Sequence, residues 1–337
     1  MTIKQRKKDH VELTTSGEVD YLSSTGFEKY QLEHNALPEV NVEDISTEIE
    51  LLDHRFSFPL FISSMTGGYV EAGSVNAIIA EFCESYNLPF GVGSQRIMLE
   101  DPETASSFSV AREKAPNAFI AANIGGAQLV GGLSKQDLNL LLDIIKANAI
   151  IVHLNPLQEL MQPEGDRNFK GIEEGIKQLC EDSPVPVIVK ETGAGISGHV
   201  AQRLLEVGVQ VIDVAGAGGT SWAKVENKRA SNKNPDNTFD NWGLLTTDCI
   251  ISVQQLQQEY DFELIASGGI RSSHDIAKSL CLGADFAASA QPVIKAVVSN
   301  GFEGLEQLFT SWKKQLITIL ALLGCEQPSD LDSKYIK

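Results

Sequence analysis

The 337-residue sequence is poor in basic residues and has no CxxC pair and no long apolar run. Lys and Arg number 27 against 45 Asp and Glu, a formal net charge of -18. A general electrostatic attraction to nucleic acid or to an anionic membrane is therefore not expected. If the ligand is an anion, the cations that hold it must be local. The most apolar stretch near the end, Leu316 to Leu323, is far too short to span a bilayer.

The five cysteines are scattered through helix-like stretches. Without paired spacing they predict buried thiols in a reducing compartment rather than disulfides or a metal site. The stretch from Met1 to His10 is polar and basic and lacks the apolar segment of a secretory signal. We therefore expect a cytoplasmic protein.

Short runs rich in Val, Ile, Phe and Ala recur along the chain, and each is followed by a helical pattern. The runs are almost continuously apolar, as in parallel strands that are buried on both faces. We predict eight strands, at Pro59–Ser64, Pro89–Gly93, Ala118–Ile124, Ala149–Asn155, Val185–Glu191, Val211–Ala215, Leu264–Ser267 and Phe286–Ala290.

Helices of ordinary length lie between the predicted strands. Ser134–Asn148 has an N-cap serine and one apolar face, and Ser272–Leu282 has a serine cap with a glycine just beyond its end. Eight β–α alternations favour a closed (β/α)8 TIM barrel of the α/β class over the alternative of a doubly wound open sheet.

The predicted barrel is a single domain over residues 59–325, with an N-terminal extension (1–58) that packs on it and a C-terminal tail (326–337). A long segment, Gly216–Thr246, follows the sixth strand and is rich in Gly, Asn, Ser and Lys, including the run from Asn232 to Asn237. Loops of this length in compact domains are usually functional or disordered. We predict a partly mobile lid.

Polar residues end all eight predicted strands. Barrel chemistry gathers at the carboxyl ends of the strands because the βα loops converge there, so eight polar ends together predict a functional site. The segments are Ser63 to Thr66, Ser94 to Arg96, Asn123, His153 to Asn155, Lys190 to Thr192, Asp213 with Gly218 to Trp222, Ser267 to Arg271, and Ser289 to Gln291.

The loops after the seventh and eighth strands are the usual phosphate site of such barrels. Gly268 and Gly269 would let backbone amides approach a phosphate, and the helix that starts near Ser272 would aim its dipole at the anion. Ser289 and Ala290 would add amides from the other side. A plain tight turn is the alternative for the two glycines.

Lys190 ends an apolar strand, where an unpaired charge is costly. A salt bridge to Glu191 or Asp213 is one interpretation. The other is a cation that faces the electron-rich atoms of a ligand, such as the N1–C2=O edge of a flavin. Neutral hydrogen bonds to the rest of that ligand could come from Thr66, Ser94, Asn123 and Thr220.

The fourth strand carries the run HLNPLQE from His153 to Glu159. Strand alternation puts His153 and Asn155 on one side, and Gln158 follows the strand-breaking proline towards the mouth. Glu159 could bind Mg²⁺, which often uses one carboxylate plus substrate phosphates. A histidine that is merely hydrogen bonded in the core is the alternative for His153.

Basic residues near the N-terminus, Arg6 to Lys8 followed by His10, could be a solvated tail. An acidic chain that binds a diphosphate needs local cations, however. We therefore predict that Arg6 and Lys7 fold over the barrel mouth, with Arg96 as a further cation.

Taken together, these residues resemble the type 2 isopentenyl-diphosphate isomerase family, which is FMN-dependent. The similarity covers nearly the whole chain, and HLNPLQE is its most specific motif. Asp9 is a small departure, because glutamate is commoner there. The other segments are Arg6 to His10, Met65 to Gly68, Gly93 to Arg96, Asn123 to Gly125, Lys190-Glu191, Gly218 to Thr220, Asn241 to Gly243 and Ser267 to Arg271.

The resemblance implies a role for each matching residue. Glu159 would bind Mg²⁺, and NADPH would reduce the FMN. Homotetramers or homo-octamers are implied as well. The residues that would hold FMN are Met65, Thr66, Gly67, Ser94, Asn123, Lys190, Thr220, Gly268, Gly269, Arg271, Ser289 and Ala290. The residues that would hold or orient the substrate are Arg6, Lys7, Ser94, Arg96, His153, Asn155 and Gln158.

The implied reaction moves the double bond of isopentenyl diphosphate to give dimethylallyl diphosphate, with His153, Asn155 and Gln158 as catalytic residues that orient the substrate beside reduced FMN. One rival is an FMN-dependent 2-hydroxy-acid oxidase or dehydrogenase, which needs a histidine base beside an arginine. Here Arg271 has no histidine near it until His274, which should lie on a helix. A non-catalytic flavin- or phosphate-binding protein is the other rival.

Overall fold

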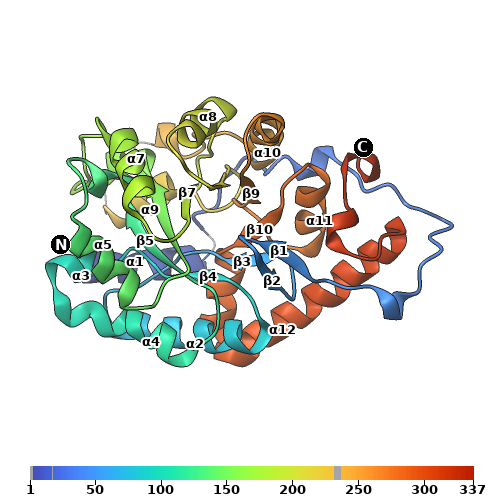
Figure 1. Cartoon of the computed structure of the whole chain (residues 1–337), viewed down its shortest axis with the longest axis horizontal. Coiled ribbons are helices and arrows are strands. Elements are labelled where there is room, and N and C mark those ends of the chain that lie inside the picture. Colours follow the sequence, from blue (N-terminus) through green and yellow to red (C-terminus); the bar gives the residue numbers. More distant parts are fainter. Residues whose placement is uncertain (1–2, 17, 231–236) are drawn as a thin grey trace.

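The structure is a computed structural model that describes residues 3–16, 18–230 and 237–337. Eight parallel strands close into a barrel in the order β10-β3-β4-β5-β6-β7-β8-β9 (Figure 1). Each predicted strand overlaps one of them, so the (β/α)8 barrel is confirmed. The strands are β3 (Leu60–Ile62), β4 (Phe90–Gly91), β5 (Ile120–Gly125), β6 (Ala149–Leu154), β7 (Val187–Glu191), β8 (Val211–Asp213), β9 (Glu263–Ala266) and β10 (Phe286–Ser289).

The barrel strands are apolar on both faces because each face meets a different core. Ile150 and Val152 of β6 pack towards the surrounding helices, whereas Ile151 packs inside the barrel. The next inward position after Ile151 is His153, and in the same way Lys190 follows Ile188. Interior positions therefore change from apolar to polar towards the carboxyl ends.

Helices surround the barrel (Figure 1). Ser134 and Ser272 cap α5 and α11 by accepting from Asp137 N and Asp275 N, as their positions predict. The helices are α1 (Ile3–Ser16), α2 (Val70–Tyr86), α3 (Arg96–Glu100), α4 (Ser106–Lys114), α5 (Lys135–Asp143), α6 (Pro156–Met161), α7 (Ile172–Asp182), α8 (Gly198–Glu206), α9 (Trp222–Arg229), α10 (Thr246–Gln254), α11 (Ser273–Cys281) and α12 (Gln291–Leu323), the last kinked at Asn300 and Gly301.

A two-stranded hairpin closes the amino-terminal end of the barrel. Its strands are β1 (Ile49–Leu51) and β2 (His54–Phe56), which pair antiparallel. Leu51 and Phe56 pack with Phe119 and Phe286 in the interior cluster. The hairpin belongs to the N-terminal extension, and its three-residue strands carry too little pattern to be predicted from the sequence.

The long segment after the sixth barrel strand contains a helix that we did not predict. Within Gly216–Thr246, α9 begins after Ser221, whose side chain accepts from Lys224 N. The helix packs on α6 and α1, so this part of the segment lies at the mouth; its mobility stays a prediction. Most of the Asn-rich run falls on residues 231–236, outside the described residues.

The N-terminal extension crosses the same end of the molecule as the polar strand ends. After α1, a strap of residues 19–25 runs along the loop after β8: Tyr21 N donates to Gly219 O at 2.9 Å, and Ser221 N donates to Val19 O at 2.8 Å. The chain end returns to this extension, since Gln31 and Lys337 exchange backbone hydrogen bonds of 2.7 and 2.9 Å.

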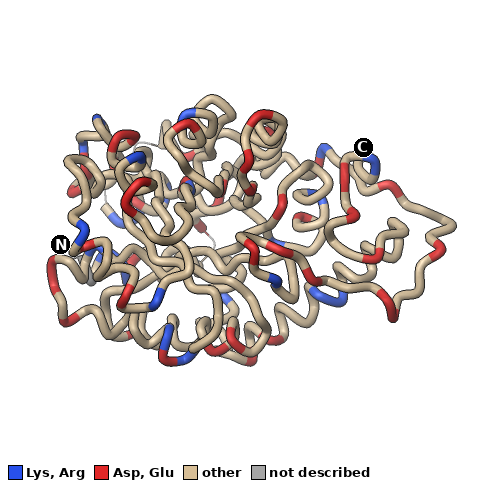
Figure 2. The backbone as a smooth tube through the Cα atoms, in the orientation of Figure 1, with Lys and Arg blue, Asp and Glu red and all other residues tan. Residues whose placement is uncertain are grey.

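All five cysteines lie within the described residues and are unpaired, and four of them are buried, which agrees with the sequence. Among the described residues, no helix has the length and apolar character needed to cross a membrane. Acidic positions lie all round the molecule, with fewer Lys and Arg among them (Figure 2).

Candidate active site

Two adjoining cavities open at the carboxyl ends of the strands. Together with the open solvent at their entrances they span about 980 and about 930 Å³. They share one wall, so ligands in the two cavities would lie beside the same side chains. The shared residues are His10, Ser64, Met65, Lys190, Thr192 and Trp222.

The first cavity collects most of the residues that the sequence assigns to the cofactor. It lies under the loops after β8, β9 and β10 and against the start of α12. The assigned residues on its wall are Met65, Lys190, Thr220, Gly268, Gly269, Arg271, Ser289 and Ala290. Ser94 and Asn123 lie on the second cavity instead.

The N-terminus of α12 faces the first cavity, in addition to the residues just before α11 that we predicted. Gln291 and Pro292 of α12 line the cavity, and no side chain caps that helix. The start of α11 is already capped, because Asp275 accepts from Arg271 N at 3.0 Å and from Ser272 Oγ at 2.9 Å. An anion in the first cavity would therefore meet the free amides and dipole of α12.

The glycines of this wall are needed largely for packing between loops. A Cβ on Gly268 would lie 2.0 Å from Gly216 O, and one on Gly218 would lie 2.4 Å from Thr25 N. Gly269, with φ +78°, lies against the Thr25 side chain. These glycines therefore let the strap and two βα loops meet, which is a different reason from the phosphate access that we inferred.

The shared wall holds an unsatisfied polar group. Ser64 Oγ is buried and has no hydrogen-bond partner among the described residues. Lys190 is buried, and its Nζ donates at 2.5 Å to the main-chain oxygen of Glu191, not to its carboxylate. An unmet hydroxyl and a buried cation fit a ligand that offers hydrogen-bond acceptors, as FMN does.

The second cavity gathers the cations. Arg6, Lys7 and Arg96 all line it, so the prediction that the basic N-terminus folds over the mouth is confirmed. Lys7 Nζ donates to Gly67 O at 2.7 Å and to Ser94 O at 2.9 Å. Burial, with a smaller contribution from Arg6, lowers the pKa of Lys7 to about 7.

His153 lies at the bottom of the second cavity. Its Nδ1 is 2.8 Å from Asn123 Oδ1, an oxygen that only accepts, so Nδ1 carries the proton of the neutral ring. Burial, together with the charges of Lys190 and Lys7, lowers the pKa of His153 to about 3. The imidazole is therefore neutral near pH 7.

Asn155, Gln158 and Glu159 meet where β6 passes into α6. Asn155 Nδ2 donates to Gln158 Oε1 at 3.2 Å and to Glu159 Oε1 at 2.9 Å, while Asp166 N donates to Glu159 Oε2 at 2.8 Å. Among the described residues no three His, Cys, Asp or Glu side chains form a metal cluster. This donor set fits Mg²⁺ only where the substrate and water supply the other ligands.

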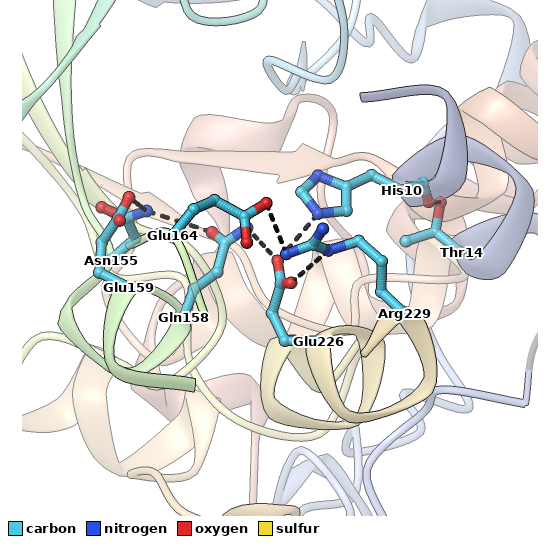
Figure 3. A network of polar contacts seen from close by, with 8 residues as sticks. All are labelled: His10, Thr14, Asn155, Gln158, Glu159, Glu164, Glu226 and Arg229. Carbon is cyan, nitrogen blue, oxygen red and sulfur yellow. Dashed lines mark hydrogen bonds and ion pairs between the residues drawn. The ribbon is translucent and has the colours of Figure 1, made fainter. Parts of the chain in front are cut away.

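A buried charge network joins these residues to α1 and α9 (Figure 3). Glu226 Oε1 accepts from His10 Nε2 at 2.8 Å and from Gln158 Nε2 at 3.3 Å. Arg229 Nε binds Glu226 Oε2 at 2.6 Å, and its Nη2 lies 2.9 Å from Glu164. Burial raises the pKa of Glu226, but the hydrogen bonds and charges of His10 and Arg229 outweigh it and leave this pKa lowered.

Two residues that the sequence assigns to the cofactor do not line either cavity. Thr66 is buried, with its hydroxyl 3.3 Å from Tyr69, and the space beside Gly67 is filled by the Phe108 ring. Conversely, sequence reasoning missed Glu226 and Arg229, which lie on α9. The serine cap at Ser221 followed by eight residues without Gly or Pro was the available signal for that helix.

Comparisons with known proteins agree with this geometry. The family described as FMN-dependent dehydrogenase matches residues 152–337, more than half of the chain. The chain therefore belongs to this class of flavin-dependent barrels. An isopentenyl-diphosphate delta-isomerase from Chlorobium luteolum is 46% identical over 98% of this chain and 94% of that protein, and one from Nostoc sp. is 42% identical over 95% and 92%. Within the class, the chain belongs to the isopentenyl-diphosphate delta-isomerase family.

Solved structures share the fold. An (S)-mandelate dehydrogenase from Pseudomonas putida aligns with TM-score 0.66 at 15% identity over 98% of each chain. A flavocytochrome b2 mutant with pyruvate bound aligns with TM-score 0.69 at 14% identity, over 97% of this chain and 82% of that one. At such identities the likeness shows the barrel architecture alone.

Proposed function

We propose that the protein converts isopentenyl diphosphate to dimethylallyl diphosphate, with reduced FMN and Mg²⁺ bound, in isoprenoid biosynthesis. The observation that carries the proposal is the shared wall: a cavity suited to a flavin adjoins a cavity lined by cations and neutral polar groups. Relatives named isopentenyl-diphosphate delta-isomerase, matched over nearly the whole chain, support the substrate.

The first cavity would hold FMN. The α12 N-terminus and the loops that carry Gly268, Gly269 and Ser289 would hold its phosphate, with Lys190 and Ser64 meeting its ring system. When bound and reduced, FMN supplies a proton donor and acceptor at N5 and an electron-rich ring. NADPH is proposed as its reductant.

Arg6, Lys7 and Arg96 would hold the diphosphate in the second cavity. Arginine forks and a lysine point charge suit phosphate oxygens. Glu159 would carry Mg²⁺, which would supply positive charge to offset that of the diphosphate. Anchored in this way, the diphosphate is restrained from leaving as the double bond moves.

His153, Asn155 and Gln158 would orient the five-carbon unit against the shared wall. Because His153 is neutral near pH 7, it adds no charge that would repel a carbocation-like transition state. All three face a cavity whose wall also includes Lys7 of α1 and Trp222 of α9, which would limit the access of water to that cation.

A 2-hydroxy-acid oxidase needs a histidine base beside its arginine. His274 is exposed on α11 and lines neither cavity, which speaks against that alternative. The catalytic set also speaks against a protein that merely binds flavin. A cytoplasmic homotetramer or homo-octamer is the proposed working form.

The purified protein, loaded with FMN and Mg²⁺ and reduced under strict anaerobiosis, should convert labelled isopentenyl diphosphate to dimethylallyl diphosphate. Glu159→Gln should need more Mg²⁺ for half-maximal rate, because it removes the one carboxylate of the metal site. If no dimethylallyl diphosphate forms with reduced flavin bound, the proposed activity is wrong.

A further inference from the structure

Glu226 is a carboxylate with no exposed side-chain surface, on a helix that covers the second cavity. Burying a carboxylate is costly unless several donors surround it. Three side chains supply such donors: His10 from α1, Gln158 from α6 and Arg229 one turn along α9 (Figure 3). The sequence analysis assigned a role to Gln158 but none to Glu226.

A carboxylate only accepts hydrogen bonds, so each partner must turn a donor towards it. Gln158 therefore directs Nε2 at Glu226, which leaves Oε1 to accept from Asn155 Nδ2. The Gln158 amide is thus held at both ends in one of its two orientations. His10 meets the same Glu226 oxygen, so its Nε2 must carry a proton.

Arg229 decides which Glu226 oxygen faces the cavity side. Its side chain is 3% exposed and lies between two carboxylates, with Nε on Glu226 Oε2 and Nη2 on Glu164. With Oε2 committed to the guanidinium, Oε1 is left for His10 and Gln158.

We propose that Glu226 is a positioning residue that fixes the orientation of the Gln158 amide and couples it, through His10, to the docking of α1 over the substrate cavity. The inference rests on the proposed function, since Gln158 would contact the five-carbon unit. Substrate orientation and closure of the cavity then depend on one buried oxygen atom.

Glu226→Gln tests the polarity of this arrangement. The new amide would give its oxygen to Arg229, which leaves its NH₂ facing the donors of Gln158 and His10. Gln158 must then flip, and its own NH₂ would face Asn155 Nδ2. We expect kcat to fall by roughly 10- to 100-fold. KM for isopentenyl diphosphate should rise as well, because α1 carries Arg6 and Lys7, whereas FMN affinity should change by less than about threefold.

The double variant Glu226→Gln, Arg229→Met should recover a large part of the lost kcat. Without the guanidinium, the amide of residue 226 is free to turn its oxygen to Gln158 and His10. A purely structural role for Glu226 predicts the opposite, because removing a second buried partner would lower activity further. Glu18→Gln is the matched control, because Glu18 forms an exposed ion pair with Lys228 of α9. This variant should behave as the unchanged protein.

The side-chain amide NMR signals of the labelled FMN-loaded protein give a readout that does not need turnover. The Gln158 NH₂ resonances should shift in Glu226→Gln and return towards their original positions in the double variant. Unchanged resonances and kcat in Glu226→Gln, or a double variant no better than the single one, would overturn the proposal. If the unchanged protein lacked isomerase activity, the proposed function would fail while the NMR test still decided the orientation.

Discussion

The two ends of the barrel interior hold different kinds of side chain. At the amino-terminal end, Leu51 and Phe56 of the hairpin pack on Phe119 and Phe286 and fill the interior with apolar side chains. At the mouth, the equivalent inward positions hold groups such as His153 and Lys190, and two cavities remain open. The same period-two strands thus carry stability at one end and chemistry at the other.

Two buried cations at the mouth are stabilised by main-chain oxygens. Lys190 and Lys7 donate to main-chain carbonyls, and the pKa values of Lys7 and His153 are far from their usual range. At the base, the partly buried Glu263 is held by Leu52 N of the hairpin turn. The difference predicts that substitutions at the base change folding, whereas substitutions at the mouth change binding and turnover.

Phe119→Ala should have the largest effect on stability. The ring lies 5.8 Å from Phe56 and 6.5 Å from Phe61, centroid to centroid, and its loss leaves a cavity at the base. We expect the free energy of unfolding to fall by about 3–5 kcal/mol, measured by urea denaturation, with FMN affinity unchanged. Phe119→Leu is the control and should lose much less. A large drop in FMN affinity in Phe119→Ala would contradict the separation of the two ends.

Lys7→Met should lower kcat/KM for isopentenyl diphosphate by roughly 100-fold, as one charge-assisted contact of about 3 kcal/mol is lost. Its unfolding free energy should change by less than about 1 kcal/mol, because the cost of burying the amine also disappears.

The pH dependence gives a second check on Lys7. The amine is protonated below its pKa of about 7, so the Lys7 contribution to kcat/KM should be full at lower pH and decline as pH rises through 7. The Met variant should lack this decline. A profile with the same step in both proteins would assign it to another group.

Glu263→Gln should have the smallest effect. Burial, with smaller contributions from Asp285, Asp53 and Asp261, raises the pKa of Glu263 to about 7. A raised carboxyl pKa favours the folded state at low pH, and this stability is lost as pH rises through the folded pKa. The amide can still accept from Leu52 N, so thermal unfolding at pH 8 should shift upward by on the order of 2 °C, with little change at pH 5. A shift that is larger at pH 5 would contradict this sign.

Much of the fold was predictable because local sequence patterns determine its strands and the starts of its helices. The continuous apolar runs marked all eight strands, and the serine caps marked the starts of α5 and α11. The hairpin β1–β2 and helix α9 were missed, since both are short and are stabilised by what they pack on rather than by their own periodicity.

The site was predicted in part for the same reason. Strand alternation and the convergence of βα loops placed His153, Asn155 and Lys190 at one mouth. The sequence pointed to the start of α11 as the phosphate-facing helix and did not point to Gln291 and Pro292 of α12, which also line the first cavity. The phosphate site itself stays a prediction. The roles in FMN, Mg²⁺ and substrate binding stay predictions.

The sequence by itself determined the barrel and its polar end. Its low number of cations also led us to predict Arg6 and Lys7 at the mouth. These follow from residue type and short-range period. Only the tertiary structure decided that Gly218 and Gly269 make room for the strap at Thr25, and that Glu226 joins His10 to Gln158. Such contacts join segments far apart in the chain, so no local pattern records them.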